Sequence, residues 1–272
     1  MKLNRIDKKF KELKKDGKKA LITFLTAGYP DLATTEKLVL EFEKNGADII
    51  ELGVPFSDPI ADGPVIQASS YAALKKGATL KKILGAVSRL RLKTAIPLTA
   101  MSYFNPILHY GLSRFIKDAV KAGLDAVIIP DLPPEEEKDF VRESRKAGLY
   151  VIRFIAPTTT LSRAKFIART ARGFIYFVSL IGVTGERRSL PLGLRSQLGS
   201  VKKTAGPVPV CAGFGVSTPD QARFVSSMCD GVIVGSAIIK VISKHIGRPG
   251  LVPAVGAFIS KLKGKPRGYP IV

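Results

Sequence analysis

Short apolar segments alternate along the chain with segments whose apolar residues recur every three to four positions. The short segments are rich in β-branched residues and predict strands, which we place at 21–25, 48–52, 96–101, 126–129, 150–155, 174–178, 208–211 and 232–234. Because nearly all of their residues are apolar, we expect parallel strands that are covered by helices. Eight such units in 272 residues favour an α/β fold of the closed (β/α)8 (TIM) barrel type over an open sheet.

The intervening segments predict amphipathic helices. An extra N-terminal helix is expected before the first strand, and others follow between the strands: 3–16, 34–45, 112–122 and 162–171. Three glycines stand where helices are expected to end, namely Gly46, Gly123 and Gly148. No linker or change of composition divides the chain, so we predict one barrel domain over residues 1–272.

Two connections are longer than the others. Residues 64–91 predict extra helical structure interrupted at Gly77, and the polar, Gly/Pro-containing loop 180–194 predicts a mobile cover. In a barrel of this type both would begin at the carboxyl ends of strands, where active sites are built.

The charge balance allows two interpretations. The chain has 43 Lys and Arg against 22 Asp and Glu, a net charge of +21. A basic protein can bind nucleic acid or another anionic surface, but it can also carry only a solvated lysine-rich surface. Because no zinc-finger, helix-turn-helix or RNA-recognition pattern accompanies the charge, we do not expect a nucleic-acid partner.

Composition also limits the cellular setting and the metal chemistry. The charged N-terminus does not lead into an apolar signal segment, and no apolar run is long enough to span a membrane. Cys211 and Cys229, with two histidines in the chain, do not form a zinc-binding pattern, so we expect no metal. We therefore expect a soluble, cytoplasmic protein with reduced thiols.

A carboxylate interrupts the second predicted strand. Alternation places Glu51 on the same face as Ile49 and Gly53. If that face points into the barrel, burial raises the pKa of Glu51 towards the range of a general acid or base. A structural glutamate paired with Lys or Arg, or one facing solvent, is the alternative.

The loop after this strand carries Asp58 and Asp62 within a Pro/Gly-rich framework. Aspartate beside proline or glycine is commonly a turn former. Following Glu51 directly, however, the loop could bring a second carboxylate across the barrel mouth, and two carboxylates in different environments can run acid and base steps at one pH.

Glycines follow the sixth, seventh and eighth predicted strands. They let backbone N–H groups approach an anion, and Ser236 adds a hydroxyl at a helix N-terminus. The predicted phosphate site comprises Gly185, Gly213, Gly215, Gly235 and Ser236. Apolar residues expected at the same mouth, where they could serve as pocket walls or as ordinary core, are Phe24, Leu25, Ile60, Met101, Ile155 and Phe214.

Several of these segments together resemble the tryptophan synthase α chain family. They are the run Glu51-Leu-Gly-Val-Pro-Phe-Ser-Asp-Pro-Ile-Ala-Asp-Gly-Pro64, Tyr176 with Ser179-Leu-Ile-Gly-Val-Thr-Gly185, Gly213-Phe-Gly215 and Gly235-Ser-Ala237. The resemblance extends from Phe24 to the helices after Ser236 and implies a lyase that splits indole-3-glycerol phosphate into indole and glyceraldehyde 3-phosphate. By position, Glu51 matches the proton-transfer carboxylate and Asp62 the carboxylate that holds the indole N–H. Tyr176 matches an active-site tyrosine, while Phe24, Thr184 and Phe214 match pocket walls or the closing loop.

The resemblance also implies a partner. In this family the α chain pairs with a pyridoxal-phosphate-dependent β chain, usually as α2β2, and the residues that match the β-facing surface include Asp58, Pro59, Asn105 and Pro133. No lysine here lies in a pyridoxal phosphate motif, so the cofactor is expected in the partner and none in this chain. Two alternatives remain. One is a lyase that works without a β chain, which would have the same catalytic residues as the α chain. The other, from a different class, is a non-catalytic basic barrel that binds phosphate or nucleic acid. The charged segment Glu186-Arg187-Arg188 departs from the family pattern in the cover loop.

Overall fold

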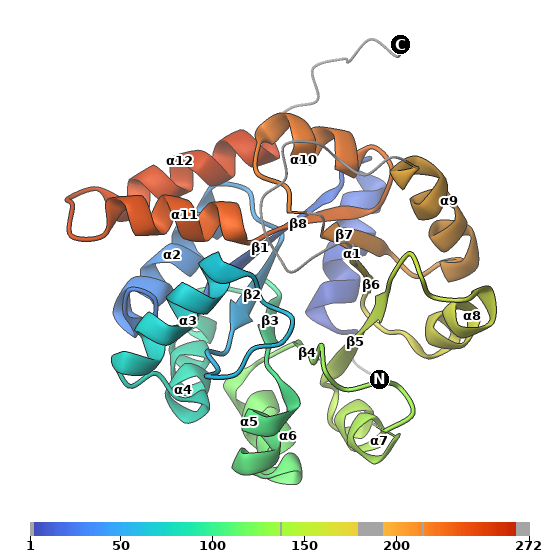
Figure 1. The fold of residues 1–272 in the computed structure, drawn as a ribbon, viewed down its shortest axis with the longest axis horizontal. Helices are drawn as coiled ribbons and strands as arrows, with labels where there is room; N and C mark the ends of the chain where they lie inside the picture. The colour runs from blue at the N-terminus through green and yellow to red at the C-terminus, as the bar shows by residue number, and fades with distance from the viewer. Residues whose placement is uncertain (1–2, 137, 179–192, 214, 265–272) are drawn as a thin grey trace.

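Eight parallel strands close into a barrel in which each strand pairs with the next and β8 pairs with β1 (Figure 1). The structure is a computed structural model, and it describes all residues except 1–2, 137, 179–192, 214 and 265–272. The strands are β1 Ala20–Thr26, β2 Ile49–Gly53, β3 Leu98–Met101, β4 Ala126–Ile128, β5 Tyr150–Ile155, β6 Ile175–Val178, β7 Val210–Gly213 and β8 Gly231–Val234. The predicted (β/α)8 fold and its eight strands are confirmed, with small shifts at the strand ends.

Helices surround the barrel in Figure 1. They are α1 Arg5–Lys15, α2 Leu32–Lys44, α3 Pro64–Lys75, α4 Leu80–Arg91, α5 Phe104–Tyr110, α6 Leu112–Ala122, α7 Lys138–Ala147, α8 Leu161–Thr170, α9 Leu194–Ala205, α10 Pro219–Ser226, α11 Ser236–His245 and α12 Leu251–Lys263. The interruption expected at Gly77 separates α3 from α4, and its φ of 72° explains why a glycine stands there. Helix α2 begins before the predicted 34–45, because Asp31 caps it by accepting a hydrogen bond from the Thr34 N–H.

The N-terminal helix closes one end of the barrel. Ile6, Phe10 and Leu13 of α1 are buried in one cluster with inward-facing strand residues, and the Phe10 ring lies 6.0 Å from that of Phe174. A second, larger cluster fills the layer between the strands and the outer helices. Since α1 seals the amino-terminal end, only the carboxyl ends of the strands are left to hold a site.

Two buried aspartates and one half-buried aspartate join neighbouring strands at the sealed end. Asp48, Asp125 and Asp230 each precede an even-numbered strand, and each carboxylate accepts the N–H of a residue in the preceding strand: Leu21 at 2.7 Å, Leu98 at 2.9 Å and Val210 at 3.0 Å. Lysine or arginine neutralises each carboxylate, as Lys263, Arg91 and Lys202 do. These contacts fix the strand register at the amino-terminal end of the barrel.

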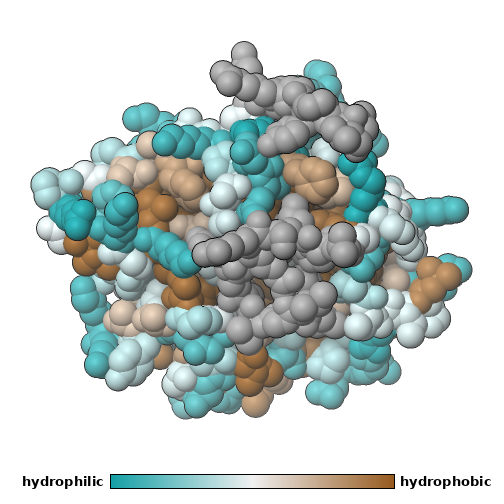
Figure 2. Space-filling model, turned by 45° about the horizontal axis from the view of Figure 1, so that its top comes forward, coloured by the Kyte–Doolittle hydropathy of each residue, from teal (hydrophilic) through white to brown (hydrophobic). Residues whose placement is uncertain are grey.

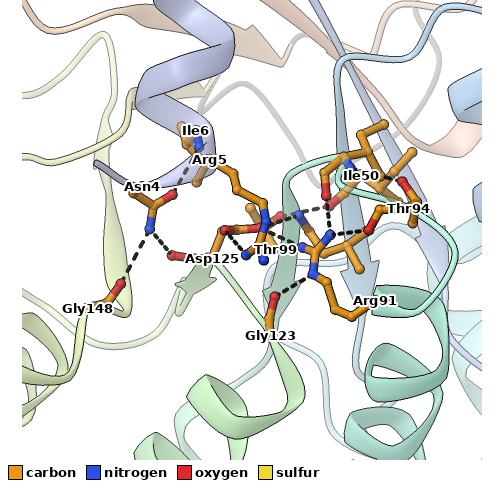
Figure 3. Close-up of polar contacts among 12 residues, drawn as sticks. Asn4, Arg5, Ile6, Ile50, Arg91, Thr94, Thr99, Gly123, Asp125 and Gly148 are labelled. Atoms are coloured by element: carbon orange, nitrogen blue, oxygen red, sulfur yellow. Dashed lines mark hydrogen bonds and ion pairs between the residues drawn. The ribbon is translucent and has the colours of Figure 1, made fainter. Parts of the chain in front are cut away.

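Asp125 has the most extensive of these networks (Figure 3). Arg91 donates to its carboxylate at 2.6 Å and to the Gly123 carbonyl at 2.7 Å, and Arg5 of α1 donates to the other carboxylate oxygen at 3.0 Å. Asn4 donates to the Asp125 carbonyl at 3.0 Å. The network therefore connects α1, α4 and the start of β4 into one rigid base.

Candidate active site

Glu51 points into the barrel from β2, on the face it was predicted to share with Ile49, so the alternative of a solvent-facing glutamate is wrong. Its side chain is 1% exposed, and neither carboxylate oxygen has a hydrogen-bond partner among the described residues. Burial raises the pKa of Glu51 to about 8, and the negative charge of Asp62 adds to that increase. The alternative of a structural glutamate paired with Lys or Arg finds no support among the described residues. At neutral pH the group is a protonated acid without a hydrogen-bond partner in the described part of the chain, which is the state a proton donor requires.

Asp62 lies at the end of the loop between β2 and α3. The Gln67 side chain donates to its carbonyl at 2.8 Å, and α3 begins two residues later at Pro64, so its backbone is fixed from the helix side. The side chain is 5% exposed, and one oxygen, Oδ1, has no partner among the described residues. Burial raises the pKa of Asp62 to about 6, while a hydrogen bond from Tyr103 lowers it. The two carboxyls therefore titrate on opposite sides of neutral pH.

Tyr176 on β6 completes this group. Burial raises the pKa of Tyr176 well above its ordinary value, and the negative charges of Glu51 and Asp62 act in the same direction. The phenol therefore remains a hydrogen-bond donor throughout the pH range of an enzyme. Its ring lies 5.0 Å from that of Phe154 on β5. The structure thus brings the three residues with predicted catalytic roles together, and those roles stay predictions.

The glycines after β7 and β8 lie where the phosphate site was predicted. Gly213 ends β7, Gly215 has a φ of 67°, and Gly235 precedes α11, whose first residue is the buried Ser236. Helix α11 has no side-chain cap, so its first N–H groups are available to an anion. This arrangement suits a phosphate, and phosphate binding at these residues stays a prediction.

Two of these glycines also make room for aromatic rings. A Cβ on Gly213 would lie 2.8 Å from the Tyr176 ring, and one on Gly235 would lie 3.2 Å from the Phe24 ring. Sequence reasoning attributed these glycines to the close approach of an anion alone. The structure adds a second reason, namely the packing of two side chains at the barrel mouth.

The remaining predicted site residues are distributed as follows. Phe24 is buried and Met101 ends β3 on the inner side, both at the mouth. In β5, alternation places Phe154 rather than Ile155 on the side of Tyr176, so a pocket role for Ile155 stays a prediction. Gly185, Thr184, Phe214 and the cover loop, apart from its last residues, lie outside the described residues.

Two other apolar residues expected at the mouth, Leu25 and Ile60, differ in their exposure. Leu25 is fully buried in the layer between strands and helices, because it alternates with the inward-facing Phe24. Ile60 is 76% exposed. The expectation that Leu25 lines the mouth is wrong, and for Ile60 it stays a prediction.

The residues predicted to face a partner lie on or near the surface. Asp58 and Asn105 are exposed, while Pro59 and Pro133 are half-buried. Leu108 on α5 adds a second exposed apolar side chain to that of Ile60. On the face shown in Figure 2, hydrophobic patches are interspersed with hydrophilic ones. Within the part of the chain that the structure describes, no helix combines the length and apolar character that crossing a membrane demands.

A closed (β/α)8 barrel with two buried carboxyls and a tyrosine at the carboxyl ends of its strands defines a barrel enzyme equipped for acid–base chemistry. The family model described as tryptophan synthase alpha chain matches residues 10–253. The chain belongs to the tryptophan synthase alpha chain family.

Individual relatives agree with this assignment. The tryptophan synthase alpha chain of Geobacter sp. (strain M21) is 51% identical over 261 residues, which cover 96% of this chain and 97% of the relative. That of Thermoanaerobacter sp. (strain X514) is 46% identical, and the match covers 96% of this chain and 99% of the relative. The crystal structure of tryptophan synthase subunit alpha from Legionella pneumophila str. Paris superposes with a TM-score of 0.89 at 39% identity, covering 96% of this chain and 97% of that one.

Sequence reasoning missed three residues near this site: Tyr103 and Gln67 contact Asp62, and Asp131 contacts the residue after Tyr103. Tyr103 follows the end of β3, Asp131 follows the end of β4, and Gln67 lies in the first turns of α3. The position of Tyr103 and Asp131 just beyond the carboxyl ends of barrel strands was a usable signal. Gln67 gave no signal, because its partner is a backbone carbonyl.

Proposed function

We propose that this chain cleaves indole-3-glycerol phosphate into indole and glyceraldehyde 3-phosphate by a retro-aldol reaction, as the α subunit of tryptophan synthase in tryptophan biosynthesis. The observation that carries the proposal is the pair Glu51 and Asp62, two buried carboxyls at the barrel mouth with different affinities for a proton. Family membership supplies the substrate and the reaction.

In this proposal Glu51 moves the protons. With a pKa of about 8 it is protonated at neutral pH and gives its proton to C3 of the indole. Its carboxylate then takes the proton of the hydroxyl beside the bond to be broken. As that carbon–carbon bond breaks, its electrons restore the indole ring and the hydroxyl carbon becomes the aldehyde. Both oxygens of Glu51 lack partners among the described residues, so they are free to face the substrate.

Asp62 and Tyr176 serve the same step in different ways. Asp62, with a pKa of about 6, is ionised at neutral pH and accepts the indole N–H, where positive charge develops after C3 is protonated. Tyr176 remains protonated and donates to the glycerol portion or to Glu51. In our proposal the N–H groups around Gly185, Gly213, Gly215, Gly235 and Ser236 hold the substrate phosphate.

We assign the aromatic pocket to Phe24, Met101, Ile155, Thr184 and Phe214. The partner is a β chain, and the assembly proposed is α2β2. Asp58, Pro59, Asn105 and Pro133 are assigned to its surface, and the exposed Ile60 and Leu108 support an apolar contact there. Pyridoxal phosphate belongs to the β chain, and this chain has no cofactor.

The barrel is one domain over residues 1–272. Two buried free thiols, Cys211 and Cys229, suit a reducing cytoplasm.

The test is indole formation from indole-3-glycerol phosphate by the purified chain. Glu51→Gln removes the proton donor at nearly constant volume, and we expect the rate to fall by about 10²–10⁴-fold. The matched control is Glu12→Gln, which changes an exposed glutamate on α1 at the sealed end. Wild-type turnover by the Glu51→Gln variant at saturating substrate would contradict the proposal.

The same assay separates a coupled α subunit from an enzyme that acts alone. Asp62 lies on a loop, and a partner that orders this loop raises the fraction of molecules ready to react; about 1.4 kcal/mol corresponds to tenfold. We expect a rise of that order when a cognate β chain is titrated at fixed ionic strength. The rise should disappear in a variant altered at Asp58 or Pro59. Full activity without the β chain would favour the independent lyase.

A further inference from the structure

Tyr103 is a buried tyrosine that contacts the loop carrying Asp62. It lies just after β3, at the position that precedes α5, and is 3% exposed. Its ring packs against that of Phe56 in the loop between β2 and α3, with 5.4 Å between ring centroids. The ring and the hydroxyl therefore both contact the segment that brings Asp62 to the barrel mouth.

The Tyr103 hydroxyl bridges two adjacent loop residues. It accepts a hydrogen bond from the Ala61 N–H at 2.9 Å and donates one to the Asp62 carboxylate. Burial raises the pKa of Tyr103 well above its ordinary value, and the negative charge of Asp62 raises it further. The hydroxyl thus keeps its proton at any pH at which the enzyme works, and it remains a donor to Asp62.

Asp131 fixes the residue that follows Tyr103. Its two carboxylate oxygens lie 2.9 and 3.2 Å from the Phe104 N–H, the first N–H of α5. Because a helix leaves its first N–H groups without intrahelical partners, this contact caps α5 from a neighbouring loop. Tyr103 immediately precedes Phe104, so the cap fixes the direction in which Tyr103 leaves the strand.

We propose that Tyr103 is a positioning residue for the lyase reaction, whose hydroxyl holds Asp62 in place and in its ionised form, and that Asp131 acts through Tyr103 by fixing the start of α5. The proposal rests on the proposed function, in which ionised Asp62 accepts the indole N–H.

Two opposing effects act on Asp62. Burial favours its neutral acid and raises its pKa to about 6, whereas the hydrogen bond from Tyr103 favours the carboxylate. Among the described residues, the other titratable groups that interact electrostatically with Asp62 are Glu51 on β2 and Tyr176 on β6. Neither changes when only the Tyr103 hydroxyl is removed. Without that hydroxyl, Asp62 loses the hydrogen bond that opposes the effect of burial, so protonation persists to higher pH.

The test compares two tyrosine variants. Tyr103→Phe keeps the ring packed on Phe56 and removes only the hydroxyl. Tyr110→Phe is the matched control, because the Tyr110 hydroxyl also donates to an aspartate, Asp118 at 2.7 Å, on the helices outside the barrel. We measure kcat and KM for indole formation across pH. In Tyr103→Phe the acid limb of kcat/KM moves to higher pH, and a displacement of one unit corresponds to about tenfold lower activity on that limb. Tyr110→Phe follows the wild type.

Further outcomes separate positioning from a merely structural role. Asp131→Ala should displace the acid limb in the same direction, and Asp131→Asn, which can still cap α5, should restore most of it. A loss of activity by Tyr103→Phe that is equal at every pH would overturn the proposal.

A second readout does not depend on turnover. The carboxyl carbon of ¹³C-labelled Asp62, assigned with Asp62→Asn, is titrated by NMR in the wild type and in Tyr103→Phe. A higher midpoint in the variant supports the positioning role even if the chain forms no indole, in which case the proposed function alone fails. Equal midpoints overturn the positioning role even if the chain is an active lyase.

Discussion

The negative charge of Asp62 raises the pKa of Glu51 beyond the increase that burial alone produces. The two residues come from one strand and the loop that follows it, yet they differ in their preferred protonation state at neutral pH. One group is then ready to donate a proton while its neighbour is ready to hold a positive charge.

A bell-shaped pH dependence follows from this relationship. Asp62 must be ionised, so kcat/KM should rise with pH through about 6; Glu51 must be protonated, so it should fall through about 8. The measurement is kcat/KM for indole formation between pH 5 and pH 10. A rate that keeps rising above pH 9 would contradict the assignment of Glu51 as the proton donor.

The burial of Glu51 should destabilise the folded protein at high pH. Its folded-state pKa is raised from the ordinary value of 4.5, so folding favours the protonated form, and stability falls progressively as pH rises from about 4.5 to about 8. Glu51→Gln should therefore increase the free energy of unfolding at pH 9 by roughly 1–3 kcal/mol, with a smaller effect at pH 6. Urea denaturation at the two pH values checks this. The exposed Glu12→Gln variant should show no such growth with pH.

Gly213 should affect Tyr176 as well as any bound phosphate. A Cβ at Gly213 would lie 2.8 Å from the Tyr176 ring, so Gly213→Ala must displace the ring. Anion approach alone predicts a higher KM, whereas displacement of Tyr176 also lowers kcat, and we expect both changes. The control is Gly199→Ala on α9, where a Cβ meets no atom within 4 Å. A pure KM effect at Gly213 would show that the tyrosine tolerates the change.

Arg91 should matter for stability rather than for chemistry. Arg91→Ala leaves the buried Asp125 without its best-buried partner and frees the carbonyl of Gly123, which we expect to lower the free energy of unfolding by about 3–5 kcal/mol. Arg5→Ala removes the more exposed partner of the same carboxylate and should lower it by about 0–1 kcal/mol. Denaturation curves give both values, and kcat of the folded Arg91→Ala protein should stay near the wild-type value. An equal, small loss in both variants would mean that Asp125 does not depend on Arg91.

Local sequence determined the order of elements and the residues with which Glu51 shares a strand face. Strand alternation in β2 fixes which face Glu51 shares with Ile49, and the apolar character of every strand requires a covered parallel sheet. The break at Gly77 was equally visible, because a chain reversal between two helices needs a residue that adopts positive φ. Each of these features depends on residues that are close together in the sequence, and the motifs that identify the family are likewise contiguous.

Contacts between distant segments were decided only by the tertiary structure. Asp125 accepts the N–H of Leu98, Asp131 caps α5 at Phe104, and Tyr103 accepts the N–H of Ala61 in the loop after β2. The partners in each pair are far apart in the sequence, and no periodic pattern of residues links them. The reason is physical: closing a parallel barrel brings strand ends together whatever their separation along the chain, and a hydrogen bond depends on that distance in space. The sequence alone predicted which side chains take part in the chemistry; the closed barrel decided which neighbours hold them in place.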